Sequence, residues 1–376
     1  MIYLDNGATS YPKPTNVLLE TQNALKYFSF NSGRGGYKES INSAEKIFSV
    51  REKVGNMFGY LPQNVVFTKN CTEALNAAIK GVVNRGEHII ISSLEHNAVF
   101  RTVYALADSG YAEFDVADFS YDENETVTNF ESKIKSNTSL IVCMHASNVF
   151  GVVFPVEKIA RLADKYKVKF IVDAAQSAGV LPLNGFSSGI DILCAPGHKS
   201  LYGSMGSGFF AVKDGLQIKP FIQGGTGSDS VNSKQPDFLP DRFESGTLNN
   251  SGIVSLGAGI DFINKKGMAN IYNHEMRLIS VLYDELNAIN NVKLYTPKPV
   301  KNSFVPLLSF NYGDYSSEHV AAYLGEHNIA VRAGIHCAPL AHKYFGTLNM
   351  GTVRICPSVF TNERECEFFI NTIKKL

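Results

Sequence analysis

The sequence predicts an α/β fold with a large, mostly parallel sheet and a second, smaller α+β unit. From about Asn64, short runs rich in β-branched residues alternate with longer helical stretches, the order that builds a parallel sheet covered by helices on both faces. The strand runs are nearly continuous in apolar residues, as expected for strands that are buried on both sides. Polar or small residues follow these runs, so ligand-binding loops are expected at the carboxyl ends of the strands.

The elements of the large sheet follow one another in a regular succession. The expected strands are VVFT (65–68), HIIIS (88–92), SLIVCMHA (139–146) and KFIVDAA (169–175). The expected helices between them are TEALNAAIKGVV (72–83), AVFRTVYALADSG (98–110) and VEKIARLADKYKV (156–168). A Gly-, Ser- and Pro-rich stretch from Gln223 to Asp237 then predicts a long loop, with a role in a site or a subunit interface.

The sequence changes character after SGIVSLGAGIDFINKKG (251–267). A helical stretch, MANIYNHEMRLISVLYDELNAI (268–289), is followed by the strand-like runs VPLLSFNY (305–312), HNIAVRA (327–333) and GTVRIC (351–356). We therefore predict a large α/β domain over residues 15–262 and a small α+β domain formed by residues 1–14 and 263–376.

Composition limits the classes of function. The chain has 376 residues, of which 44% are hydrophobic and 19% charged, as in a globular protein with two packed units. Lys plus Arg and Asp plus Glu are each 35, so no net field would gather nucleic acid or an anionic membrane, and the expected partner is a small molecule. The N-terminus lacks a signal-peptide pattern and no window reaches the roughly 18 apolar residues of a spanning helix, which predicts a cytoplasmic protein.

The six cysteines contain no CxxC pair, which disfavours a disulfide framework and a structural zinc site. We expect reduced thiols, most of them small core residues. Cys337 differs, because VRAGIHCAPLAH (331–342) places it on a short loop beside Arg332 and His336, an electropositive setting that favours the thiolate. A rival interpretation takes His336, Cys337 and His342 as metal ligands, but no fourth ligand is in view.

Two polar residues follow apolar runs at positions that suit a cofactor. Lys199 lies at the end of ILCAPGHKSLYG (192–203), in a turn bordered by Gly197 and Gly203, and burial there would lower its ammonium pKa as a Schiff-base lysine requires. Asp173 directly follows a buried strand, with Gln176 one turn on, and a carboxylate at that place needs a cationic partner or serves as a helix cap.

Further candidates lie after the other strands. The amides around Cys71 and Thr72 form a helix N-terminus suited to a phosphate, a role compatible with helix capping by Thr72. His96 follows the next strand, where an imidazole could stack on a flat ring, and Asn148 follows another. Each of these residues taken alone could equally be a satisfied core or loop residue.

The order of the motifs carries a specific resemblance over essentially the whole chain. The motifs are YLDNGAT (3–9), EHNAV (95–99), HASNVFG (145–151), DAAQS (173–177), GHKSLYG (197–203), RFESGTLN (242–249), VRAGIHCAPLAH (331–342) and GTVRICPSVF (351–360). Together they closely resemble class V aminotransferase-fold enzymes, and within them the cysteine desulfurases. The resemblance implies the aspartate aminotransferase-like fold, known as fold type I, with a sheet of seven strands in the large domain.

The resemblance also implies pyridoxal 5'-phosphate as the cofactor, and it assigns a role to each matching residue. Lys199 would carry the cofactor, Asp173 would pair with the pyridine nitrogen, Gln176 would bond the ring hydroxyl, His96 would stack on the ring with Asn148 beside it, and Thr72 and His198 would hold the phosphate. Pro196 stands where many relatives carry a serine or threonine, so one phosphate contact is missing from this set.

The remaining roles concern the substrate and a second subunit. Arg354 is similar to the arginine that grips the substrate carboxylate by a two-pronged pair, and Arg332 would position the cysteine loop. Cys337 would accept sulfur from L-cysteine as a persulfide, on a loop that resembles the compact one of group II desulfurases. His96 would shuttle protons. A homodimer is implied, with Thr247 reaching the phosphate of the neighbouring subunit, and a sulfur-acceptor protein is a possible partner.

Other functions on the same frame stay open at this point. A selenocysteine lyase would differ in its preference for selenium over sulfur. An aminotransferase would make Cys337 incidental. A cofactor-free binding protein is disfavoured, because all the cofactor residues are present.

Overall fold

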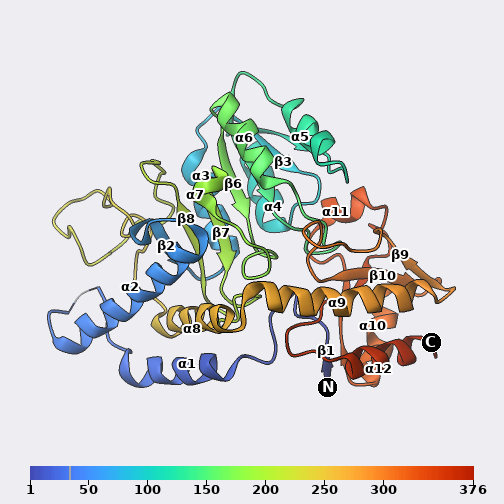
Figure 1. Ribbon diagram of the computed structural model, residues 1–376. Helices are drawn as coiled ribbons and strands as arrows, with labels where there is room; N and C mark the ends of the chain where they lie inside the picture. The colour runs from blue at the N-terminus through green and yellow to red at the C-terminus, as the bar shows by residue number, and fades with distance from the viewer. Residues whose placement is uncertain (34) are drawn as a thin grey trace.

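A seven-stranded sheet lies at the centre of the molecule (Figure 1), a computed structural model that describes residues 1–33 and 35–376. The strand order is β2-β8-β7-β6-β5-β3-β4, in which β8 is antiparallel to both neighbours and the other pairings are parallel. The expected mostly parallel sheet is therefore confirmed. The strands are β2 (Val65–Thr68), β3 (His88–Ser92), β4 (Glu113–Ala117), β5 (Thr138–Met144), β6 (Lys169–Asp173), β7 (Ile192–Pro196) and β8 (Gly208–Val212).

Helices cover both faces of this sheet. In β3, Ile89 and Ile91 pack with α3 and α4 in one apolar cluster, whereas Ile90 between them belongs to the cluster that contains α2, α6 and α8. This alternation follows from the two-residue period of a strand, and it explains why the strands read as continuous apolar runs. The helices are α1 (Thr15–Tyr27), α2 (Lys38–Phe58), α3 (Cys71–Val82), α4 (Asn97–Asp108), α5 (Glu123–Glu131), α6 (Val156–Tyr166), α7 (Gly185–Ser188) and α8 (Asn250–Lys266), with a 3-10 turn at Pro62–Asn64.

A second, four-stranded antiparallel sheet lies in the C-terminal part, in the order β12-β13-β10-β9. The long helix α9 runs from beside α8 to this sheet (Figure 1). The elements are α9 (Met268–Asn287), β9 (Val292–Leu294), β10 (Leu308–Tyr312), α10 (Ser317–Glu326), β11 (Ile329–Ala330), β12 (Arg332–Gly334), α11 (Pro339–Tyr344), β13 (Thr352–Ile355) and α12 (Glu363–Ile373).

The run HNIAVRA, expected as one strand, forms two. β11 pairs with β1 (Ile2–Tyr3), whereas β12 pairs with β13 of the four-stranded sheet. The chain changes partner at Val331, which a local apolar pattern does not reveal. The division into domains at residues 14/15 and 262/263 stays a prediction, and the second of these boundaries falls within α8.

The predicted loop is present, and it is longer than expected. From residue 213 to residue 249, between β8 and α8, the structure contains neither helix nor strand. In the described residues, no helix is both long and apolar enough to cross a membrane.

A buried ion pair anchors the end of this loop to the large sheet. Arg51 of α2 is 5% exposed and Glu244 is 8% exposed, and they form a two-pronged pair. Arg51 also donates to the Val65 carbonyl at 2.6 Å, and the Phe67 amide donates to Glu244 Oε1 at 2.7 Å. The pair therefore joins α2, β2 and the loop.

Glu244→Ala is expected to lower the free energy of unfolding by about 3–5 kcal/mol, because it leaves the Arg51 guanidinium buried without a counter-charge. Urea unfolding of the ligand-free protein measures the change. The control is Glu285→Ala, which breaks an exposed pair with Lys374 and should cost less than about 1 kcal/mol. Equal effects of the two substitutions would contradict the role given to the buried pair.

Candidate active site

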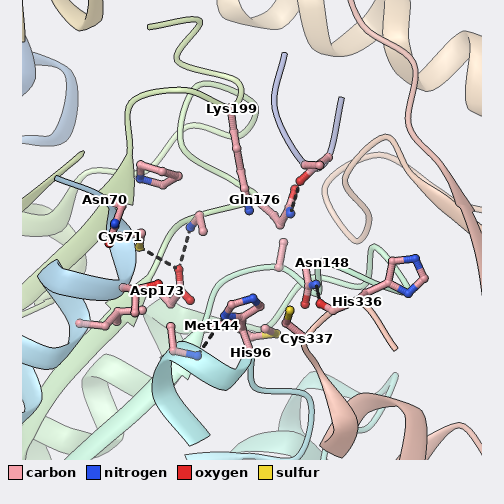
Figure 2. Close-up of a pocket in the computed structure, with 18 of the residues that line it drawn as sticks. Asn70, Cys71, His96, Met144, Asn148, Asp173, Gln176, Lys199, His336 and Cys337 are labelled. Carbon is pink, nitrogen blue, oxygen red and sulfur yellow. Dashed lines mark hydrogen bonds between the residues drawn. The ribbon is translucent and has the colours of Figure 1, made fainter. Parts of the chain in front are cut away.

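A cavity of about 290 Å³ lies at the carboxyl ends of β5, β6 and β7, the edge at which the sequence predicts ligand-binding loops. Its walls come from both sheets and from the N-terminal segment (Figure 2). The lining residues that the sequence analysis singled out are Cys71, Thr72, His96, Asn148, Asp173, Gln176, Pro196, His198, Lys199, Arg332, His336, Cys337 and Arg354. Thr247 is exposed and does not line it.

Lys199 lies in a tight turn after β7. The Gly203 amide donates to the Gly197 carbonyl at 2.7 Å, and the Tyr202 amide donates to the Lys199 carbonyl at 2.8 Å. A Cβ atom at Gly203 would lie 2.9 Å from that Gly197 carbonyl oxygen, so the turn requires glycine there. Burial lowers the ammonium pKa of Lys199, which favours the neutral amine, as the sequence analysis expected.

The backbone before Lys199 is held by the N-terminal segment. The His198 carbonyl accepts hydrogen bonds from Thr9 Oγ1 at 3.0 Å, from the Ser10 amide at 3.1 Å and from Lys13 Nζ at 2.8 Å. Burial lowers the pKa of Lys13 to about 8. Lys13 was not predicted from the sequence, because a lysine near a chain end carries no local sign of a buried partner.

Asp173 ends β6 and is 4% exposed. Its Oδ1 accepts from the Ala175 amide at 2.8 Å and from Cys71 Sγ at 3.6 Å (Figure 2). Burial raises the pKa of this carboxyl despite these donors. Beside it, Gln176 Nε2 donates to the Gly7 carbonyl at 3.0 Å, so the N-terminal segment reaches this wall as well.

The N-terminus of α3 opens onto the cavity. Asn70 caps the helix by accepting the Glu73 amide at 2.9 Å, and Asn70, Cys71 and Thr72 all line the cavity. The expected capping role of Thr72 is therefore filled by Asn70 instead. The first-turn amides and the positive end of the helix dipole favour an anion at this place.

His96 also lines the cavity, as the N-cap of α4. Its Nδ1 accepts the Ala98 amide at 3.0 Å, which assigns the proton of the neutral ring to Nε2. Burial, and then the charge that the nearby Lys199 carries when protonated, lower the pKa of His96 to about 4. The ring is therefore neutral near pH 7.

Cys337 lies between β12 and α11, on a loop of four residues. All six cysteines lie in the described residues as free thiols, and only Cys337 is exposed. His336 and Cys337 both have left-handed backbones, with φ of 52° and 56°, a conformation that costs about 1–2 kcal/mol for each such residue. Asn148 Nδ2 donates to the His336 carbonyl at 2.8 Å, and the Asn97 amide donates to the Cys337 carbonyl at 2.7 Å.

The charge beside Cys337 differs from the sequence-based expectation. Arg332 Nη2 lies 3.9 Å from Cys337 Sγ and supplies a positive charge. His336 does not, because burial lowers its pKa to about 2. Within residues 1–33 and 35–376, no group of three or more His, Cys, Asp or Glu side chains is arranged to hold a metal ion.

Arg354 is 1% exposed and already has two partners. Its Nη2 donates to Asp5 Oδ1 at 2.7 Å, and its Nη1 donates to the Asn148 carbonyl at 2.7 Å, whereas Nε has no partner in the described residues. A Cβ atom at Gly7 would lie 3.1 Å from Arg354 Cζ, so glycine lets the N-terminal backbone lie against the guanidinium. Asp5 and Gly7 lie within the opening YLDNGAT motif. That motif is the sequence feature that could have indicated a contact between the N-terminal segment and Arg354.

Comparisons with known proteins show the family to which the chain belongs. The Aminotransferase class-V family model matches residues 2–369. The chain is 31% identical to a probable cysteine desulfurase of Methanothermobacter thermautotrophicus, over 100% of this chain and 94% of that protein. It is also 31% identical to a probable cysteine desulfurase of Synechocystis sp., over 100% and 90% of the two chains. A solved apo structure of the cysteine desulfurase from Thermococcus onnurineus superposes with a TM-score of 0.92 and 30% identity, covering 100% of this chain and 94% of that one.

Lys199→Met is expected to stabilise the ligand-free protein, more near pH 7 than near pH 10. An unfolded lysine titrates near about 10.4, and burial lowers the pKa of the folded group. Between the two values the unfolded state binds more protons, so the wild-type protein gains stability as pH rises and the variant does not. Unfolding midpoints measured across this range test the difference, and a constant gap between the two proteins would count against a desolvated Lys199.

Proposed function

The chain belongs to the aminotransferase class V family, and on that premise we propose that it is a pyridoxal-phosphate-dependent cysteine desulfurase. It converts L-cysteine to L-alanine and takes the sulfur on Cys337 as a persulfide. The observation that carries the proposal is that an exposed thiol, Cys337, lines the same cavity as Lys199 and Asp173. The activity named for relatives at 31% identity over the whole chain supports it.

The cavity fits the cofactor at several atoms. Asp173 uses only Oδ1 for its hydrogen bonds, which leaves Oδ2 for a protonated ring nitrogen. The amides at the N-terminus of α3 suit the phosphate. His198 Nδ1 and Asn148 Oδ1 are buried and have no partner in the described residues, as expected of groups that wait for a ligand.

Each wall of the cavity then has a role. Lys199 would bind the cofactor aldehyde. Around the ring, Asp173 would hold the nitrogen, Gln176 would bond the hydroxyl, and His96 would stack on the face with Asn148 beside it. The phosphate would be held by Cys71, Thr72 and His198. Pyridoxal phosphate, when bound, supplies the electron sink that permits proton removal at the substrate Cα.

The chain's own groups perform the remaining steps. Arg354, held by Asp5, receives the substrate carboxylate through Nε and the N–H groups that its present partners leave free. The neutral Lys199 amine takes the Cα proton, and the neutral His96, with its proton on Nε2, can exchange protons. The Cys337 thiolate, next to Arg332, attacks the substrate sulfur, so the carbon–sulfur bond breaks and a sulfur–sulfur bond forms.

We also propose a homodimer in which Thr247 serves the partner's site. Thr247 is exposed and is not among the residues that line the cavity of its own chain. A neighbouring hollow, lined by Gly246 and Leu248, also contains Asn31, Gly33 and Phe48, and α1 and α2 carry further exposed apolar side chains. The cytoplasmic location and a sulfur-acceptor protein remain parts of the same proposal.

Cys337→Ala is expected to reduce alanine formation from cysteine by at least about a hundredfold, because the variant lacks the nucleophile. Wild-type protein treated with cysteine should gain the mass of one sulfur atom on Cys337. The matched control is Cys366→Ala, which removes a buried thiol of α12 and should keep turnover. Full desulfuration by Cys337→Ala under reducing conditions would disprove the persulfide role.

A mixture of Lys199→Ala and Thr247→Ala chains tests the shared site. A mixed dimer contains one site with an intact Lys199 and an intact Thr247 from the other chain, so refolding the two variants together should restore activity above that of either alone. Activity equal to the average of the two separate variants would place Thr247 within its own chain's site or outside any site.

A further inference from the structure

Behind Cys337, three buried side chains form a continuous hydrogen-bonded chain. Thr347 Oγ1 lies 2.7 Å from His342 Nδ1, His342 Nε2 lies 3.4 Å from His336 Nδ1, and His336 Nε2 lies 3.4 Å from the Arg332 carbonyl. The two imidazole rings are nearly parallel, with an interplanar angle of 7°. The exposed fractions are 3% for Thr347, 0% for His342 and 4% for His336.

The direction of each hydrogen bond follows from one end of this chain. The Arg332 carbonyl only accepts, so His336 carries its proton on Nε2 and its Nδ1 accepts. His342 must then donate from Nε2, and its Nδ1 accepts from the Thr347 hydroxyl. Burial lowers the pKa of His336 to about 2 and of His342 to about 4, so both rings are neutral and each has one donor and one acceptor.

These hydrogen bonds between side chains end at His336, where the backbone conformation is unfavourable. His336 and Cys337 are the two successive residues with left-handed φ, which side chains other than glycine rarely adopt. Figure 2 shows the His336 ring pointing away from Lys199 and Asp173, while Cys337 faces His96 and Asn148. Asn148 and the Asn97 amide hold the two carbonyls of this turn on the cavity side. On the other side, the His336 ring holds this turn through its hydrogen bonds to His342 and to the Arg332 carbonyl.

We propose that the chain Thr347–His342–His336 is a positioning element that maintains the left-handed turn and so presents the Cys337 thiol to the substrate sulfur. Thr347 and His342 are the positioning residues, and neither lines the cavity. The inference rests on the proposed function for the role of Cys337, but the conformational part does not depend on it.

The Thr347 hydroxyl provides the sharpest variant. Thr347→Val keeps the shape and removes the donor, so His342 Nδ1 is left buried without its partner and the ring loses the hydrogen bond that fixes its orientation toward His336. Thr347→Ser keeps the donor. For His342, phenylalanine removes the donor, whereas glutamine can supply an N–H close to the position of Nε2. His319→Phe, on an exposed histidine of α10, is the control.

Hydrogen exchange in the cofactor-free protein tests the conformation. The Asn97 amide bonds the Cys337 carbonyl, and the Ala338 amide bonds the Ile335 carbonyl, so both report on the turn. We expect these amides to exchange at least about tenfold faster in Thr347→Val and His342→Phe than in wild type. Thr347→Ser, His342→Gln and His319→Phe should exchange as wild type does.

Turnover with cofactor bound tests the consequence. For Thr347→Val, kcat for alanine formation should fall about tenfold to a hundredfold, with KM for cysteine and the absorbance change on cysteine binding unchanged, because only the thiol is misplaced. Thr347→Ser should restore kcat.

The proposal would be overturned if the two amides of Thr347→Val exchanged at the wild-type rate. It would also be overturned if kcat fell equally in Thr347→Ser and Thr347→Val. If His342→Phe fails to fold, the comparison of Thr347→Val with Thr347→Ser is sufficient to test the proposal. Faster exchange in a protein that produces no alanine at all would uphold the turn and reject the desulfurase function instead.

Discussion

The parallel pairing of β5, β6 and β7 is the constraint on which the site depends. Met144 lies opposite Asp173, and Asp173 lies opposite Cys194, so the three strands end at one edge of the sheet. The segments that follow these strands carry Asn148, Gln176 and Lys199 into the same cavity. A register shift of one residue in β6 would turn Asp173 to the other face of the sheet, where it would lie among apolar side chains.

The N-terminal segment also contacts residues that line the cavity. Asp5 pairs with Arg354, the Gly7 carbonyl accepts from Gln176, and Lys13 bonds the carbonyl that precedes Lys199. A segment of nine residues, from Asp5 to Lys13, thus contacts Arg354, Gln176 and the backbone before Lys199. Because these bonds are buried or half-buried, each also compensates a polar group that would otherwise lose its hydration. The segment therefore couples the two sheets at the cavity.

Buried ionisable groups give the cavity its chemical character. Burial moves Lys199 and Asp173 toward their neutral forms and keeps His96 and His336 unprotonated near pH 7. A neutral amine and a neutral imidazole can take part in proton transfer. Burial of these groups and of the Asp173 carboxyl is unfavourable for folding. The strained turn at Cys337 is also unfavourable for folding, and it places the exposed thiol at the cavity.

The sequence by itself determined four strands of the large sheet and the order of the motifs, because apolar periodicity and turn chemistry depend on near neighbours. β2 and β3 match their predicted bounds, and the Gly197–Gly203 turn follows from its glycines. Only the tertiary structure decided that Asp5 and Lys13 serve the cavity, that HNIAVRA divides between two sheets, and that His336 is buried and neutral rather than cationic. These outcomes depend on contacts between distant residues and on the exclusion of water, which no local pattern encodes.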